Sequence, residues 1–326
     1  MNQIIWIDWA YLGRSQNLAN RLGAKYYSLN YFSAKPQRMF FLFRYLLAST
    51  KTISLLISQK PATVIMTGSP PFPHFIVYFL SKFKKMKYVI DTHSGYFDDP
   101  KFQILPRLRK KVLENAFFHI VTNDVHKNIV ESNNGKAVIV GALIENNDSI
   151  KGYEFKNDKN IVLVSSYSSD EPLDIIFDVA SKMPDVTIYI TGNEKKASKA
   201  FISKCKSFPN IVLTGFLPTE KYISYIKGST AVMALTTRDN TMQRGAYEAL
   251  SYKVPVITSN WLLLRQSFYK GAVHIDNTAI DLERAINKVC SNIDEFKTEI
   301  AELNSEYTQT FESRIHAIRK TLQNVM

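Results

Sequence analysis

The sequence predicts an α/β protein with two doubly wound domains. The chain has 326 residues, enough for two domains that each bury a full core. Short apolar runs alternate with longer segments of helical periodicity, as in a parallel sheet covered by helices on both faces. A polar stretch without such periodicity, residues 146–159, separates two halves that repeat this plan.

The first domain is expected at residues 1–150. Its strands are predicted at residues 3–7, 25–29, 63–66, 87–90, 119–122 and 137–140. Its helices are predicted up to residue 21 and at residues 36–59, 74–82, 105–115 and 126–132.

The second domain is expected at residues 151–326. Its strands are predicted at residues 161–164, 187–191, 211–213, 230–234, 254–257 and 272–275. The end of the chain has a helical pattern, and the final helix, about residues 306–326, is expected to pack back on the first domain. Two domains of this kind bind their ligand between them, so we expect a central cleft.

Composition and motifs exclude several classes of protein. Cys205 and Cys290 lack metal-ligand spacing, which indicates a reducing compartment. Residues 1–8 are typical of a buried strand and not of a signal peptide. The apolar tracts are shorter than the roughly 18 residues that a spanning helix needs. The sequence contains no GxGxxG, GxxxxGK[ST] or GxSxG motif. We expect a cytoplasmic protein, either soluble or bound to the inner face of a membrane.

The positive charge lies almost entirely in the first half. Residues 1–150 contain 19 Lys and Arg against 9 Asp and Glu, a balance of +10, whereas residues 151–326 contain 22 against 20, a balance of +2. The first half therefore fits an anionic partner, with nucleic acid, an anionic membrane and a pyrophosphate-bearing substrate as the candidates. Charge that only keeps the protein soluble is the alternative. No nucleic-acid motif accompanies the charge, so nucleic acid is not an expected partner.

Two basic clusters and an aromatic patch favour an anionic membrane surface as that partner. The clusters are residues 81–87 (SKFKKMK) and 107–111 (RLRKK), and the patch is residues 39–45 (MFFLFRY). Each Lys or Arg near such a surface contributes about 1 kcal/mol, and the aromatic side chains would add apolar contact. The alternative is ordinary helix packing with a charged rim.

The stretch from residue 234 to residue 260 has the features of a phosphate site. An apolar strand is followed by a polar loop at residues 236–242, a helix at about 243–252 and a second apolar strand at 253–258. A strand, a loop and a helix N-terminus in this order hold phosphate groups in α/β proteins.

Three motifs of the second half resemble the nucleotide-sugar domain of GT-B glycosyltransferases, especially glycosyltransferase family 4. They are residues 188–193 (IYITGN), 209–217 (PNIVLTGFL) and 248–257 (EALSYKVPVI). The resemblance implies a GT-B fold and sugar transfer from a UDP- or GDP-sugar to a hydroxyl group. It also implies a lipid-linked or oligosaccharide acceptor in bacterial capsule, exopolysaccharide or O-antigen synthesis. The nucleotide sugar would be a co-substrate, with no further cofactor and no bound metal.

The sequence departs from that family at two places. Asn240 stands where the family has the first of two glutamates, which leaves the contact with the donor sugar open. Residues 165–171 (SSYSSDE) stand where the family has an Arg and a Lys that bind the diphosphate. The phosphate charge must therefore be met by other residues.

Several candidate donor-binding residues follow from this resemblance. Glu248 would accept hydrogen bonds from the two ribose hydroxyls, or would be an ordinary exposed helix glutamate. The start of the helix that carries it would bind the diphosphate. Its residues are Thr241, Met242, Gln243 and Arg244. Thr241 could instead be only a cap.

Arg238, Gly192 and Asn193 complete the expected donor site. Arg238, together with Arg244, is a candidate replacement for the missing cations. Gly192 and Asn193 would let the nucleobase approach the backbone, or would form a structural turn.

The first domain is expected to bind the acceptor and to supply the base. Asp91 and His93 follow a buried strand, and His93 matches a family histidine by position. Either could deprotonate the acceptor hydroxyl, although Asp91 could instead only cap its loop. The backbone amides of Gly13, Arg14, Gly68 and Ser69 are also expected to contact the donor phosphate or the acceptor. We interpret Asp98 and Asp99 as a loop turn and not as a metal site.

Two other functions fit the same sequence. A GT-B nucleotide-sugar epimerase would use the same nucleotide site without needing a basic first half. A non-catalytic partner subunit of a transferase would explain Asn240 and the missing Arg and Lys.

Overall fold

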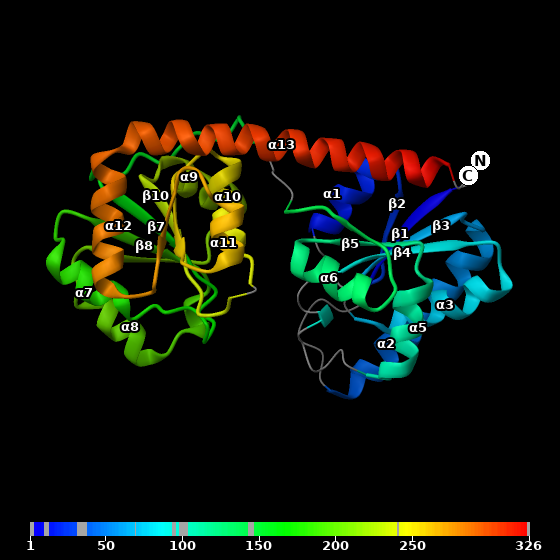
Figure 1. Cartoon of the computed structure of the whole chain (residues 1–326). Helices are drawn as coiled ribbons and strands as arrows, with labels where there is room; N and C mark the ends of the chain where they lie inside the picture. Colours follow the sequence, from blue (N-terminus) through cyan, green and yellow to red (C-terminus); the bar gives the residue numbers. More distant parts are fainter. Residues whose placement is uncertain are drawn as a thin grey trace. The chain divides into compact units, whose positions relative to one another are not determined.

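The computed structural model describes residues 3–9, 13–30, 38–68, 70–92, 96–97, 104–142, 147–239 and 241–324, without the side chains of residues 38–42. It contains two parallel six-stranded sheets with flanking helices, which confirms the predicted fold class (Figure 1). The chain divides into two compact units. The first consists of Met1–Leu143 with Thr310–Met326, and the second of Ile144–Gln309.

The first unit is built on a sheet of order β2-β1-β3-β4-β5-β6, in which all neighbouring strands are parallel. Its strands are β1 (Ile4–Asp8), β2 (Lys25–Ser28), β3 (Thr63–Thr67), β4 (Lys87–Asp91), β5 (Phe118–Val121) and β6 (Ala137–Ile139). The order reverses between β1 and β3, so the switch point lies there.

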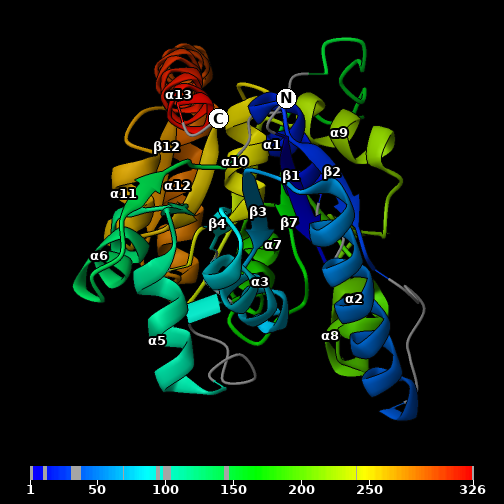
Figure 2. The same ribbon diagram turned by 90° about the vertical axis from the view of Figure 1, so that its right-hand side faces the viewer.

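In the part of the chain that the structure describes, five helices that alternate with the strands cover this sheet. They are α1 (Gly13–Leu22), α2 (Arg38–Gln59), α3 (Phe72–Phe83), α5 (Pro106–Asn115) and α6 (Asp124–Ser132). Helices α2, α3 and α5 lie side by side on one face, with α3 packed against both of the others (Figure 2). Their inner sides bury residues such as Leu56, Val77 and Val112 against Ile7, Met66 and Ile90 of the strands.

The second unit repeats the plan with a sheet of order β12-β11-β10-β7-β8-β9, again parallel throughout. Its strands are β7 (Asn160–Val164), β8 (Thr187–Thr191), β9 (Ile211–Gly215), β10 (Ala231–Ala234), β11 (Val256–Ser259) and β12 (Ala272–Ile275). Here the order reverses between β7 and β10, which places the switch point between these two strands.

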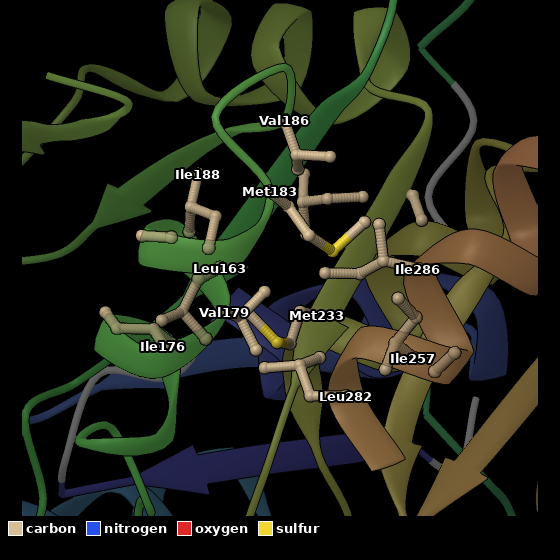
Figure 3. Packing of buried hydrophobic residues seen from close by; sticks show 14 of the residues in the cluster. Leu163, Ile176, Val179, Met183, Val186, Ile188, Met233, Ile257, Leu282 and Ile286 are labelled. Carbon is tan, nitrogen blue, oxygen red and sulfur yellow. The ribbon is translucent and has the colours of Figure 1, made fainter. Parts of the chain in front are cut away.

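The helices of the second unit enclose a continuous apolar core. They are α7 (Ile175–Lys182), α8 (Lys199–Lys206), α9 (Thr219–Gly228), α10 (Arg244–Ser251), α11 (Leu262–Ser267), α12 (Ala279–Ser291) and the 3-10 helix η2 (Glu194–Lys196). Figure 3 shows Val179 of α7 and Leu282 of α12 packed over Leu163, Met233 and Ile257 of the sheet. These side chains are inaccessible to water, so the core fixes the edge of the sheet that carries the loops described below.

The last helix, α13 (Ile293–Gln323), contributes to both units. Its residues up to Gln309 belong to the second unit, and those from Thr310 belong to the first. In the first unit, the ring of Phe311 lies under the guanidinium of Arg21, and Glu312 pairs with the same arginine. Ile315, Ile318 and Leu322 are buried on the same segment.

Some boundaries differ from the predicted ones. The strand predicted from residue 253 begins at Val256, because Lys253 adopts a left-handed conformation with φ of 57° and Pro255 precedes the first paired residue. Helix α6 begins at Asp124, two residues earlier than predicted, because Asn123 caps it by accepting a hydrogen bond from the His126 amide. None of the helices within the described ranges is long and apolar enough to cross a membrane.

Candidate functional site

At the carboxyl edge of the second sheet, Asp170 joins the two loops that flank the switch point. It belongs to the loop after β7, whereas its partners belong to the loop after β10. Its carboxylate accepts a hydrogen bond from Thr236 Oγ1 at 3.0 Å, and its carbonyl accepts one from the Thr237 amide at 2.7 Å. Arg238 Nη2 lies 3.7 Å from the same carboxylate. The loops therefore form one structure at the place where doubly wound folds bind their ligands.

Thr236 anchors this structure to the rest of the sheet. Its amide donates to Ser259 Oγ at 2.9 Å, at the end of β11. Its carbonyl accepts from Trp261 Nε1 at 2.9 Å and from Asn277 Nδ2 at 3.0 Å. Because Thr236 is fully buried and held from three sides, the loop after β10 starts from a fixed point.

Asp170 carries a stable negative charge. Burial raises the pKa of its carboxyl, but the hydroxyls of Ser168 and Thr236 and the charge of Arg238 lower it, and the net shift is downward. Arg238 itself has 63% of its side chain exposed, so its guanidinium faces water while it approaches Asp170. Arg238, which is predicted to bind phosphate, therefore already has an acidic neighbour in Asp170.

The neighbouring Glu171 is held by a ring of neutral donors. Its carboxylate accepts from Ser165 Oγ at 2.5 Å and from Ser166 Oγ at 2.6 Å. It also accepts from the amides of Ser166, at 2.9 Å, and Tyr167, at 3.1 Å. Tyr167 adopts a positive φ of 57°, as in the turns whose successive N–H groups form anion-binding nests. We call Ser165, Ser166 and Tyr167 the β7 nest.

Helix α10 begins next to this nest. Its N-cap is Gln243, which makes no side-chain capping bond, and its first residue is Arg244. Thr241 thus lies before the cap, and the alternative that Thr241 itself caps the helix is wrong. A Cβ on Gly245 would come within 2.7 Å of Val164 Cβ, the residue that precedes the nest. Only glycine permits this close approach, which places the helix start and the nest at the same edge.

Glu248 lies one turn into α10 and has two protein partners. Its Oε1 accepts from Arg244 Nε at 2.8 Å, and its Oε2 accepts from the Tyr222 hydroxyl of α9. Burial raises the pKa of Tyr222, and the Glu248 charge raises it further, so this tyrosine stays a donor. Glu248 is mostly buried, unlike the exposed helix glutamate of the alternative interpretation, whereas the Arg244 side chain is 91% exposed.

Gly192 and Asn193 follow β8 at the same edge. A Cβ on Gly192 would lie 2.2 Å from the Ser165 carbonyl oxygen, and its φ of 117° is one that other residues rarely adopt. Gly192 therefore brings the β8 loop against the β7 nest. Asn193 caps η2 through its side chain, which accepts from the Lys195 amide at 3.1 Å. Both residues have structural roles here, as the alternative interpretation holds.

In the first unit, the expected site residues are tied to the protein itself. Asp91, at the end of β4, is fully buried, and Arg14 Nη2 lies 3.7 Å from its Oδ1. Arg14 also donates to the carbonyls of Val140, at 2.9 Å, and Gly141. These contacts tie α1 to the end of β6, so the Arg14 side chain has a packing role, and the expected ligand contact of its backbone amide stays a prediction.

Gly13 and Gly68, the two expected site glycines of the first unit that the structure describes, have different surroundings. The Gly68 amide donates to the Asp91 carbonyl at 2.7 Å, and a Cβ at Gly68 would come within 3.0 Å of that oxygen. The expectation that this amide contacts a ligand is therefore wrong. Gly13 is exposed and has open space around its Cα. Ser69, His93, Asp98, Asp99 and Asn240 lie outside the described residues. Within the described ranges, no group of three or more His, Cys, Asp or Glu is arranged to hold a metal ion.

One family of known proteins matches part of the chain. Residues 145–304 match the family described as glycosyl transferases group 1. The matched segment lies within the second unit. None of the curated proteins matches the chain.

Solved structures resemble the whole chain. Sucrose-phosphate synthase from Thermosynechococcus elongatus has a TM-score of 0.75 at 11% identity, with 99% of each chain covered. Anabaena Alr3699/HepE in complex with UDP has a TM-score of 0.70 at 12% identity and covers 99% of this chain and 100% of its own. The same protein was solved with UDP-glucose. A glycosyltransferase from Rickettsia africae has a TM-score of 0.68 at 12% identity, covering 100% and 99%. At such low identity, the likeness shows a shared GT-B fold.

Three residues of the second unit were not predicted as site residues. Tyr222 meets Glu248 from another helix, and no sequence pattern relates two residues that far apart. Asp170 and Glu171 lie in residues 165–171, a segment that stood out in the sequence only because it lacks the Arg and Lys of the family. The signal that could have found them is the run of serines before two carboxylates at a strand end, because hydroxyls and turn amides are natural carboxylate partners.

Proposed function

We propose that this protein transfers a sugar from a nucleoside-diphosphate sugar to a hydroxyl acceptor. The observation that carries the proposal is the pair of interlocked loops at the β7–β10 switch point, in a domain that matches the group 1 glycosyltransferases. The sheet order brings the start of α10 at Arg244 and the nest at the end of β7 to the same edge. Together these two features supply the N–H and O–H groups that could donate hydrogen bonds to an anionic ligand.

Glu248 is the proposed ribose ligand. Tyr222 and Arg244 each donate to one of its oxygens and thereby fix the carboxylate. A carboxylate oxygen has two acceptor sites, so Glu248 can accept the ribose hydroxyls in addition. The exposed Arg244, with the amides at the start of α10, would meet the diphosphate. UDP is the favoured nucleotide because Anabaena HepE was solved with UDP and UDP-glucose, and GDP is the alternative.

The first unit is proposed to bind the acceptor and to supply the base. Asp91 is fully buried beside Arg14, which favours a role in holding the strand end over direct contact with an acceptor. We therefore propose His93, two residues later, as the base, with Asp91 as a positioning residue. Asn240 is the proposed donor-sugar contact, and Gly13 and Ser69 belong to the proposed acceptor loops. We propose no cofactor and no metal, with the diphosphate charge met by arginines and amides.

An anionic membrane is the proposed partner of the first unit. Helix α2 exposes an apolar stripe with heptad spacing, consisting of Phe43, Leu46, Ile53 and Ile57. The adjacent α3 exposes Phe72, Phe79 and Phe83, the last with 87% of its surface in water. Large exposed apolar surfaces of this kind usually mark an interaction site.

Charge complementarity favours lipid as the ligand of this face. Exposed basic residues lie among the apolar ones on α2, α3 and α5 and just beyond α3, namely Lys51, Lys82, Lys85, Arg107, Lys110 and Lys111. Residues 38–90 contain no Asp or Glu at all. An apolar face with a basic rim fits the interface of an anionic bilayer. A protein bound to the membrane through this face would be able to reach a lipid-linked acceptor of bacterial surface polysaccharide synthesis.

Titration with nucleotides tests the proposed function. Calorimetry of the full chain with UDP and GDP should show binding, and mass spectrometry with a panel of nucleotide sugars should identify the donor. Glu248→Ala should weaken binding by about 2–3 kcal/mol, because charge-assisted hydrogen bonds to two hydroxyls are lost. Glu154→Ala, an exposed residue before β7, is the control.

The outcomes separate the candidate functions. No binding of either nucleotide would reject the transferase and favour a non-catalytic partner subunit. Conversion of a nucleotide sugar without any acceptor would indicate an epimerase. Binding that survives Glu248→Ala unchanged would place the nucleotide elsewhere.

A further inference from the structure

The β7 nest holds a carboxylate of its own chain at the edge where the donor is proposed to bind. We propose that Glu171 fills the place of a donor phosphate group when no donor is bound. Donor binding would then be an exchange, in which a phosphate replaces the Glu171 carboxylate in the nest. This inference rests on the proposed function and names a residue that controls the affinity of its site.

The first argument is the set of donors around Glu171. Both carboxylate oxygens are used, each by one serine hydroxyl and by one amide. The Ser166 amide also lies 3.2 Å from the second oxygen. Successive amides of a turn, together with hydroxyls, form the type of concave site that binds phosphate oxygens. The same atoms can thus satisfy either anion.

The second argument is charge. Within the described ranges, no Lys or Arg forms an ion pair with Glu171, and Arg238 pairs with Asp170 instead. The carboxylate is therefore held by dipoles alone. A phosphate placed beside it would meet an unscreened like charge at close range, which is unfavourable. The phosphate can use the nest only if Glu171 leaves it.

The third argument is access. Ser166 is exposed and Glu171 is half-buried, so the nest opens to water and the side chain can turn outward. The close contact of Gly245 with Val164 places the start of α10 beside the nest. A diphosphate has two anionic groups, and this edge offers two places for them. One is the start of α10, and the other is the nest.

Removal of the carboxylate should therefore tighten anion binding. Calorimetry of the full chain would compare UDP and inorganic pyrophosphate on the wild type, Glu171→Ala and Glu171→Gln. We expect Glu171→Ala to lower the Kd for UDP at least fivefold, since the ligand no longer displaces a charge. Glu171→Gln keeps an acceptor in the nest without its charge and should lie between the two. In the Glu171→Ala background, Ser166→Ala should weaken UDP binding again.

Asp174→Ala is the matched control. Asp174 is exposed, lies three residues further along and makes no capping bond, so this variant removes a charge close to the nest without opening it. Equal tightening by Asp174→Ala would reduce the effect to general electrostatics and overturn the proposal. Thermal denaturation verifies that each variant is folded. Should Glu171→Ala fail to fold, Glu171→Gln decides with the same criterion.

The remaining outcomes are also decisive. Unchanged or weaker UDP binding by folded Glu171 variants would show that Glu171 only holds its loop together, and the exchange would be rejected. The proposed function would still stand. Absence of UDP and GDP binding in the wild type and in every variant would reject the proposed function and the exchange together.

Discussion

Two carboxylates at equivalent sheet edges have opposite surroundings. Asp91 ends β4 of the first unit, is fully buried and lies beside the guanidinium of Arg14. Glu171 follows β7 of the second unit, reaches water and is held by hydroxyls and amides. Both positions are at the carboxyl ends of parallel strands, where α/β proteins usually bind ligands.

The difference shows that position in the fold does not by itself make a binding residue. Arg14 and Asp91 share a buried charge pair, and Arg14 is further bonded to two carbonyls. Such a group is costly to move because it would leave charge and carbonyls unpaired. The partners of Glu171 are neutral, and Ser166 among them is exposed, so they would bind another anion in the proposed exchange. The contacts of the first edge contribute to stability, whereas those of the second fit the proposed exchange.

The largest expected effect is that of Arg14→Ala on the first unit. Removing one partner of a buried charge pair should lower the free energy of unfolding by about 3–5 kcal/mol. Arg238→Ala, its exposed counterpart in the second unit, should cost less than about 1 kcal/mol. Urea denaturation measures both. In a Trp261→Phe background the remaining tryptophans, Trp6 and Trp9, report on the first unit alone. A loss below 1 kcal/mol for Arg14→Ala would contradict the comparison.

The next effect is the acid sensitivity of the first unit. Burial lowers the pKa of His74 and of His119 to about 4. Between pH 6.5 and 4 the unfolded chain binds more protons than the folded one, so stability is full above pH 6.5 and falls as the pH drops. The loss should reach about 3 kcal/mol for each histidine.

Denaturation as a function of pH would test this sensitivity. His119→Gln should flatten the dependence in the first unit, whereas His316→Gln, at an exposed position of α13, should leave it unchanged. Identical slopes in the wild type and His119→Gln would show that the buried histidine does not carry the effect.

The smallest expected effect concerns the exposed aromatic residues of the two units. Phe83 is 87% exposed in the first unit, and Phe216 is 82% exposed in the second. Burying a phenylalanine in an apolar phase contributes about 1.5–3 kcal/mol. Phe83→Ser should therefore lower binding to phosphatidylglycerol vesicles about tenfold or more in co-sedimentation, and Phe216→Ser should not change it. Equal effects of the two variants would remove α3 from the proposed membrane face.

The fold could be predicted because its signal is repeated along the chain. Runs such as Ile4–Asp8 and Thr63–Thr67 are mostly apolar and fully buried, and helical patterns separate them, so each strand supports the same topology. The site was harder, because its contacts connect distant residues. Tyr222 and Glu248, or Arg14 and Asp91, meet only after the chain has folded.

The errors at the site have a common physical cause. Sequence identified polar residues at strand ends and could not tell which of them were already satisfied. The Gly68 amide donates to the Asp91 carbonyl of its own unit, and no local sequence pattern indicates this bond. The sequence of the β7 nest was interpreted as the loss of two cations that bind phosphate. In the structure, hydroxyl and amide donors of this segment surround a carboxylate.

The shared helix α13 has a consequence for biosynthesis. The first unit needs Thr310–Met326, whose Phe311 and Ile315 are buried, yet this segment is translated after the second unit. The first unit therefore cannot complete its core before the second unit has been synthesised, even though domains commonly fold in order of synthesis. A nascent chain arrested before residue 310 should remain protease-sensitive in residues 1–143, and translation through this segment should coincide with protection.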